Sequence, residues 1–232
     1  MLRLVGFFIA VLVALEFLRH VPLIGAIFRV PLLGFYLAAI VVAGLLSRYA
    51  SAALDQRKQK ALERQLGAVD TPHNKGKLGL LLLAQRRYAK AMPLLAEASH
   101  YEPESAELHY RFGSAALGAN ELEVAVRELE ACTRIEEEHA YGSAMLRLAE
   151  AYSNAELNDN SRAAIDRFER NHGPSPESAF RRGLALRATG DGEGARKAFG
   201  EVSALSTQVS KFQKKGASGW VLRAWLARLS TR

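Results

Sequence analysis

The sequence predicts an all-α protein, and three observations support this fold class. Two uncharged apolar runs near the N-terminus, residues 4–15 and 30–46, have the composition of membrane helices. A Leu-Gly pair and a Phe-Gly pair lie 34 residues apart in the middle of the chain, a spacing typical of helical repeats. Residues 220–229 combine tryptophan and leucine at helical spacing. We therefore expect a membrane hairpin, a helical repeat region and a final helix.

Residues 1–49 predict two transmembrane helices. A helix needs about 20 residues to cross a bilayer, and the two apolar runs reach that length with their flanks, as residues 1–18 and 27–49. A cleaved signal peptide is the alternative for the first run, but residues 16–22 offer no cleavage site of small residues. A pair of buried globular helices is disfavoured because these residues show almost no polar face.

Basic residues beside the apolar runs predict the orientation of the hairpin. Five basic residues lie between positions 48 and 64, whereas the turn between the runs holds only Arg19 and Arg29. Lys and Arg beside membrane helices favour the cytoplasmic side. We therefore expect a multi-pass protein of the inner (cell) membrane with its repeat region in the cytoplasm. A periplasmic or extracytoplasmic assembly factor is the alternative.

Residues 50–71 predict a helical linker. Residues 51–67 consist mainly of strong helix formers, so we expect a helix that continues the second membrane helix. Residues 68–77 contain Thr-Pro and Lys-Gly, which mark a turn. The repeat region is expected over residues 72–205, and a basic C-terminal segment over residues 206–232.

Residues recur at a shift of 34 positions after the linker. Leu78-Gly79 recurs as Phe112-Gly113, and the pair Ala91 and Leu95 recurs as Ala125 and Leu129. This spacing and these residue types resemble the tetratricopeptide repeat (TPR) family, whose pattern is W-x2-L-G-x2-Y…A-x3-F…P. The resemblance implies units of two antiparallel helices that stack into a right-handed α-solenoid of about four helix pairs.

Four units follow from the resemblance, the third of them irregular. The small residues at which two helices of a unit approach each other are Gly79, Gly113, Ala149 and Gly183 on the first helices, and Ala91, Ala125, Ala164 and Ala195 on the second. The larger residues expected between units are Leu95, Leu129, Phe168 and Phe199. With this alignment the turn of the third unit, residues 153–162, is about three residues longer than the pattern requires.

The C-terminal helix has two possible roles. Its apolar residues are expected on one broad face with Arg223 and Arg228 opposite or flanking; these are Trp220, Leu222, Trp225, Leu226 and Leu229. A helix array needs a terminal cap, so this helix is expected to lie over the fourth unit. The other interpretation is a basic amphipathic helix on anionic lipid, with Trp220 and Trp225 at the membrane interface.

Charge and residue usage argue against nucleic-acid binding and catalysis. The net charge of +7 is uneven: residues 97–159 hold 14 acidic and 4 basic residues, and residues 211–232 hold 6 basic residues and no acid. A nucleic-acid protein is expected to show one continuous basic face. The single cysteine and six unpaired histidines predict no metal site, and no phosphate-binding loop occurs. We expect no catalytic residues and no cofactor; an enzyme whose site the sequence does not reveal is the less favoured alternative.

The resemblance also implies a binding surface. In TPR domains the first helices of the units line a groove that holds a peptide or a partner helix. The corresponding positions are Leu80, Leu83, Tyr110, Ser114, Leu117, Leu146, Glu150, Asn154, Phe180, Leu184 and Arg187. The Lys/Asn clamp that holds a C-terminal carboxylate in some TPR domains is absent, which favours a mixed or apolar segment. We expect a membrane-anchored scaffold for protein–protein interaction, unless these residues pack against the linker helix or the tail.

Overall fold

The computed structural model of the chain describes residues 31–209 and 214–231. All regular secondary structure in these ranges is α-helical, and no strand occurs there. The helices are α3 (Pro31–Gly67), α4 (Pro72–Ala84), α5 (Tyr88–Tyr101), α6 (Ala106–Ala119), α7 (Leu122–Ile135), α8 (Ser143–Asn154), α9 (Asn158–His172), α10 (Pro176–Ala188), α11 (Gly192–Gln208) and α12 (Lys214–Leu229). The chain divides into two units, residues 1–62 and 63–232, and α3 crosses the division.

Helix α3 runs without a break through 37 residues, which corresponds to about 55 Å. It therefore includes the linker helix expected at residues 51–67. The first expected membrane span, residues 1–18, lies outside the described residues, as do residues 27–30 of the second. Within the described residues, no helix combines the length and apolar character that a membrane crossing requires. The membrane hairpin has no support from the structure and stays a prediction.

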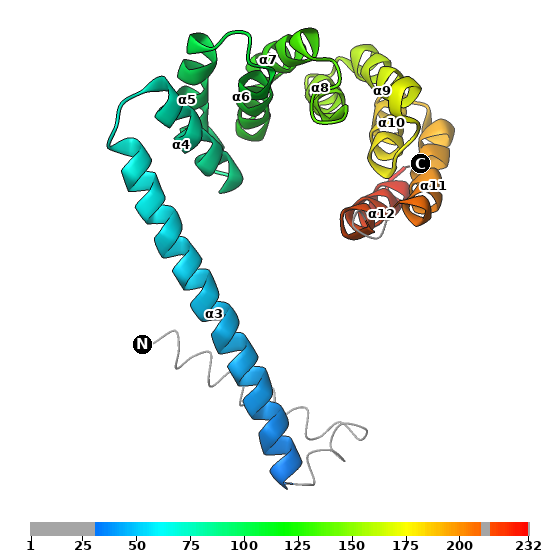
Figure 1. Ribbon diagram of the computed structural model, residues 1–232. Coiled ribbons are helices and arrows are strands. Elements are labelled where there is room, and N and C mark those ends of the chain that lie inside the picture. The colour runs from blue at the N-terminus through cyan, green and yellow to red at the C-terminus, as the bar shows by residue number, and fades with distance from the viewer. Residues whose placement is uncertain (1–30, 210–213, 232) are drawn as a thin grey trace. The chain divides into compact units, whose positions relative to one another are not determined.

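Helices α4 to α11 pack as four consecutive helix pairs, α4–α5, α6–α7, α8–α9 and α10–α11. In Figure 1 the first helices of the pairs line the inner side of an arc, and the second helices line its outer side. Each inner helix also contacts the inner helix of the next pair, and α12 packs against α10 and α11 at the far end of the array. The expected all-α array of four helix pairs is confirmed.

The turn inside each pair has the same backbone geometry. A residue in the left-handed region follows each inner helix: Arg86 (φ 58°), Asn120 (φ 65°), Glu156 (φ 61°) and Gly190 (φ 85°). The next residue donates its N–H to the carbonyl five positions earlier, at 2.9 to 3.0 Å, which is the helix-ending Schellman arrangement. The turn of the third pair therefore matches the others, and the expectation of a longer turn there is wrong. The additional residues lie between α7 and α8, at positions 136–142.

The register expected for α9 is wrong by three residues. Ser161 and Ile165 take the places equivalent to Ala125 and Leu129, where Ala164 and Phe168 were expected. Ile165 is fully buried, as Leu129 is, and the Ser161 hydroxyl donates to the Ala149 carbonyl at 2.8 Å. Ala164 and Phe168 are also buried, one turn further along the helix.

Glycines on the inner helices allow close packing within three of the pairs. A Cβ added at Gly79 or Gly113 lies 2.7 Å from the Cγ atom of Leu95 or Leu129, respectively. A Cβ at Gly183 lies 2.5 Å from a ring carbon of Phe199. No side chain fits at these separations, so the larger residue of each outer helix rests directly on the backbone of its inner partner. The expected pairing of small and large residues is confirmed here.

Side-chain caps fix the start of three inner helices. Thr71 begins α4 and Ser105 begins α6, each accepting the N–H of the residue three positions later. At the start of α10, Ser175 and Ser178 form a reciprocal capping box. Helix α8 instead begins after Gly142, whose φ of 75° lies in the left-handed region. This different start follows the longer connection between the second and third pairs.

The C-terminal region contains more helix than expected. Helix α11 extends to Gln208, and α12 begins at Lys214 rather than near Trp220. Ala217 and Ala224 of α12 are buried, and Trp220 packs against the cluster that contains Phe199. The expectation that Trp220 shares one face with Leu222, Trp225, Leu226 and Leu229 is wrong, because those four residues are exposed.

Candidate functional site

The residues expected to bind a partner lie on the four inner helices. Helix α4 carries Leu80 and Leu83; α6 carries Tyr110, Ser114 and Leu117; α8 carries Leu146, Glu150 and Asn154; α10 carries Phe180, Leu184 and Arg187. We call the surface formed by these helices the inner groove. The four helices follow one another along the inner side of the arc in Figure 1, so the groove passes along all four pairs.

The α4 part of the inner groove is apolar. Leu80 and Leu83 are half-buried and pack against a cluster that includes Leu95 and Phe112. Their remaining exposed surface can contact apolar side chains of a partner. The linker helix is not part of this cluster among the described residues, so the expected alternative of packing against the linker does not apply to these two leucines.

The α6 part holds a buried hydroxyl group. Only 7% of Ser114 is exposed, and its Oγ atom has no hydrogen-bond partner among the described residues. Leaving such a group without a partner costs about 1–3 kcal/mol. Tyr110 and Leu117, one turn before and after Ser114, are half-buried. A ligand backbone that supplies a donor or acceptor at Ser114 therefore recovers a hydrogen bond that the fold does not make.

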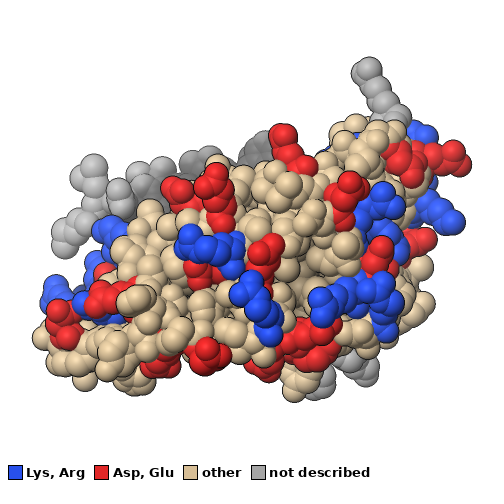
Figure 2. All heavy atoms as spheres, turned by 90° about the horizontal axis from the view of Figure 1, so that it is seen from above, with Lys and Arg blue, Asp and Glu red and all other residues tan. Residues whose placement is uncertain are grey.

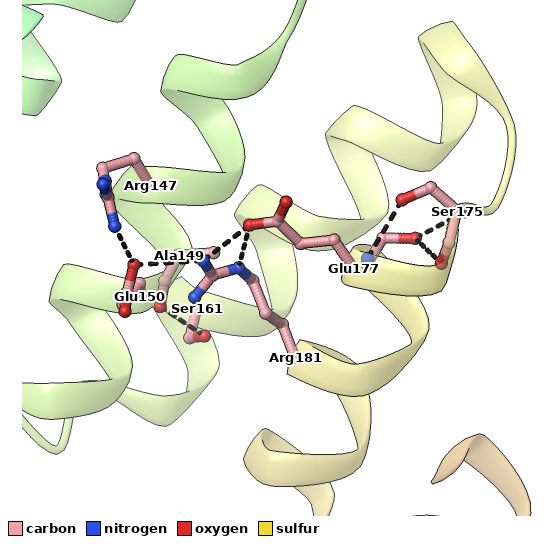
Figure 3. A network of polar contacts seen from close by, with 8 residues as sticks. Arg147, Ala149, Glu150, Ser161, Ser175, Glu177 and Arg181 are labelled. Carbon is pink, nitrogen blue, oxygen red and sulfur yellow. Dashed lines mark hydrogen bonds and ion pairs between the residues drawn. The ribbon is translucent and has the colours of Figure 1, made fainter. Parts of the chain in front are cut away.

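A carboxylate between two guanidinium groups occupies the α8 part of the groove. Glu150 accepts hydrogen bonds from Arg147 at 2.7 Å and from Arg181 at 3.0 Å (Figure 3). Arg181 also pairs with Glu177 at 2.6 Å. Burial raises the pKa of the Glu150 carboxyl, but the charge of Arg181 and the hydrogen bonds from both arginines outweigh burial and lower this pKa below 4.5. The network joins α8 to α10 and holds the carboxylate in its charged form.

Sequence reasoning missed the basic members of this groove. Lys77, Arg111, Arg147 and Arg181 stand at the same position of the four inner helices, at steps of 34, 36 and 34 residues. The recurrence was available in the sequence as a signal. Arg111 pairs with Glu107 at 2.6 Å, whereas Lys77 is exposed and forms no ion pair with any described residue. The inner groove thus alternates charged groups with apolar side chains.

Helix α12 covers the fourth part of the groove. The Phe180 ring lies 5.5 Å from the Trp220 ring, and Arg187 donates a hydrogen bond to the Ser230 hydroxyl at 3.2 Å. Leu184 packs in the same apolar cluster as Trp220. For these three positions the alternative interpretation, packing against the tail, describes the structure.

A pocket of about 90 Å³ lies where α8, α10 and α12 meet. It brings together four of the expected groove residues, Glu150, Asn154, Phe180 and Leu184, with Arg181, Trp220 and Arg223 among its other lining residues. Leu80, Leu83, Tyr110, Ser114 and Leu117 do not line this pocket. The accessible groove therefore comprises the inner surface of α4, α6 and α8 and ends at this pocket.

The chemistry of the described residues favours binding over catalysis. Burial raises the pKa of the Cys132 thiol to about 12, which keeps it protonated and a poor nucleophile. No group of three or more His, Cys, Asp or Glu residues able to hold a metal occurs in the described part of the chain. On the face drawn in Figure 2, acidic and basic side chains intermingle, without a broad area of one sign.

Two family models, each described as tetratricopeptide repeat, match residues 82–148 and 146–207, which together exceed half of the chain. No curated protein sequence matches. Solved structures share the fold: residues 41 to the end of MamA from Desulfovibrio magneticus RS-1 have 20% identity and a TM-score of 0.59, covering 72% of this chain and 97% of MamA. TTC0263, a TPR protein of Thermus thermophilus, has 16% identity and a TM-score of 0.54, covering 80% and 95%.

Proposed function

Because the chain belongs to the tetratricopeptide repeat family, we propose that it is a non-enzymatic scaffold whose inner groove binds a segment of a partner protein. Proteins of this family generally mediate protein–protein interaction, and no enzyme family matches the chain. The binding region is the inner surface of α4, α6 and α8, since α12 contacts the groove residues of α10.

The buried hydroxyl of Ser114 is the observation that carries this proposal. It lies on the middle one of the three accessible inner helices and has no hydrogen-bond partner among the described residues. Buried polar groups in folded proteins almost always have a partner. An extended peptide supplies backbone donors and acceptors at this position, and its side chains then meet Leu80, Leu83 and Leu117. The bound segment completes a hydrogen bond for which the groove is already shaped.

The charges of the groove favour a partner segment of mixed character. Lys77 is exposed without an ion pair among the described residues, so it offers a positive charge at the α4 end. Arg111 is 40% exposed beside Glu107 and can exchange part of that pairing for a ligand carboxylate. An apolar segment with at least one acidic residue toward α4 fits this arrangement.

Crosslinking from single positions tests the binding surface. A photo-reactive residue replaces Lys77 or Asn154, which are exposed on inner helices, or Glu123 or Arg134, which are exposed on the outer helix α7. In intact cells we expect the same partner segment to be captured from both inner positions and from neither outer one. Capture of that segment mainly from the outer positions would contradict the proposal.

Residues 1–49 are proposed to tether the scaffold to the membrane, with the repeat region on the cytoplasmic side. The apolar runs at residues 4–15 and 30–46 and the basic residues after the second run support this tether. Resistance of the protein to alkaline extraction of membranes tests the tether, and a reporter active only in the cytoplasm, fused after Arg232, tests the side. Extraction into the soluble fraction would exclude the tether, and a silent reporter would favour the periplasmic alternative.

A further inference from the structure

Helix α12 exposes a stripe of large apolar side chains. Leu222, Trp225, Leu226 and Leu229 have exposed fractions of 59%, 57%, 53% and 67%. They follow the spacing i, i+3, i+4, i+7, so they lie on one side of the helix. We call these four residues the outer stripe. Apolar surface gathered in this way on a folded protein usually marks an interaction site.

The opposite side of α12 makes the contacts that hold the helix on the array. Ala217 and Ala224 are buried there, and Trp220 and Val221 pack with Phe199 of α11. The capping role therefore uses one side of the helix and leaves the outer stripe without a described partner. A helix that only caps an array needs a polar outer side for solubility. The outer stripe calls for a second function.

Basic residues flank the outer stripe. Successive side chains of a helix are rotated by about 100°, which places Arg223 and Arg228 at opposite edges of the stripe. Both arginines are exposed, and residues 211–232 hold 6 basic residues and no acidic residue. The guanidinium of Arg223 also lies 4.7 Å from the Trp220 ring, which holds this arginine near the protein surface. The whole segment therefore favours an anionic surface.

We propose that the outer stripe of α12 inserts into the interface of an anionic phospholipid bilayer while its other side caps the helix array. Leucine side chains enter the boundary between headgroups and acyl chains, and tryptophan prefers this interface. Arg223 and Arg228 pair with lipid phosphates at the edges of the stripe. A second copy of the chain is a poorer occupant, because it brings two acid-free basic segments together and their charges repel each other.

The two tryptophans provide a built-in comparison for the test. Trp220 and Trp225 are the only tryptophans of the chain, and they lie on opposite sides of α12. The variants Trp220→Phe and Trp225→Phe each leave a single fluorophore in the full chain. Each variant is incorporated from detergent into vesicles of phosphatidylcholine alone or mixed with phosphatidylglycerol, both carrying brominated acyl chains that quench nearby tryptophan. Because the readout is local to α12, membrane attachment through residues 1–49 does not affect the comparison.

In anionic vesicles we expect strong quenching of Trp225 and weak quenching of Trp220. In neutral vesicles, or in anionic vesicles at high salt, Trp225 quenching falls, because screening weakens the attraction of the arginines. Arg228→Gln reduces the insertion equilibrium about fivefold, whereas Arg134→Gln on α7 leaves it unchanged. Equal quenching of both tryptophans, or none in any vesicle, overturns the proposal. Protection of Trp225 from aqueous iodide without lipid quenching also overturns it and indicates a protein occupant.

Discussion

At the residue scale, Gly113 shows how tightly the helices of one pair approach. A Cβ at this position meets the Cγ atom of Leu129 at 2.7 Å and the backbone nitrogen of the same residue at 3.2 Å. Leu129 is fully buried, so its side chain has no free space to move into. Relief of the contact requires α6 and α7 to separate. The same glycine position in the first and fourth pairs shows that this constraint is a property of the repeat.

Gly113→Ala is expected to lower the free energy of unfolding by about 1–3 kcal/mol, the usual cost of overpacking. This loss exceeds the gain of up to about 1 kcal/mol that alanine brings to a helix. Gly200→Ala in α11 is the matched control: its added Cβ meets nothing within 4 Å, so the thermal midpoint rises. Thermal unfolding followed by circular dichroism measures both variants. A Gly113→Ala midpoint at or above that of the unaltered chain would refute the packing argument.

Glu150 makes the stability of the array depend on pH. The arginines lower the pKa of its carboxyl below the ordinary value of 4.5, so its contribution to stability is complete above pH 4.5. That contribution disappears as the pH falls through the folded-state pKa. We expect the thermal midpoint to fall on acidification below pH 4.5, and Glu150→Gln to show a smaller fall. At neutral pH the variant is less stable, because Arg147 and Arg181 lose their charged partner. Parallel curves for the two proteins would show that Glu150 does not contribute.

At the scale of elements, the left-handed turns and the position of α9 explain what the sequence could predict. Gly190 marks its turn through residue type, but Arg86 and Glu156 adopt the same left-handed geometry without that signal. The α9 register was misjudged because Ser161 and Ala164 are three positions apart, less than one helical turn, and both are small and buried. Periodicity alone does not separate two such residues. The hydrogen bond from Ser161 to the Ala149 carbonyl distinguishes them, and it depends on the folded pair.

Helix α12 presents the same ambiguity on a larger scale. Its apolar residues surround much of the helix, so the sequence pattern placed Trp220 and Trp225 together. The structure separates them: Trp220 packs 5.5 Å from Phe180, whereas Trp225 is 57% exposed. Only the contact with α10 and α11 identifies the side that caps the array.

Trp220→Ala is expected to destabilise the array by about 2 kcal/mol, below the range for a fully buried tryptophan because Trp220 is half-buried. For a domain of this size the thermal midpoint falls by about 4–8 °C. Trp225→Ala is the control and leaves the midpoint nearly unchanged, since its side chain is exposed. Thermal unfolding in the absence of lipid measures the difference. Equal losses in the two variants would contradict the assignment of the capping side.

At the scale of the helix array, α12 determines which part of the inner groove remains accessible. The repeat positions of the groove could be predicted from the 34-residue spacing, and all eleven residues lie on inner helices. The loss of Phe180, Leu184 and Arg187 to α12 could not be predicted, because Arg187 meets Ser230 only through a contact 43 residues away in the sequence. The missing partner of Ser114 likewise depends on the packing around it. Spacing predicts where groove residues lie, but tertiary contacts decide which of them are available.

The affinity of the crosslinked partner segment for Ser114→Ala tests the account most directly. If the segment satisfies the buried hydroxyl, its loss removes about 1–1.5 kcal/mol of binding, a roughly tenfold weaker Kd by calorimetry. Ser203→Ala, an exposed serine on the outer helix α11, is the control and retains full affinity. The account predicts weaker binding for Ser114→Ala alone. Equal affinities of Ser114→Ala and the unaltered chain would contradict a partner bound over α4, α6 and α8.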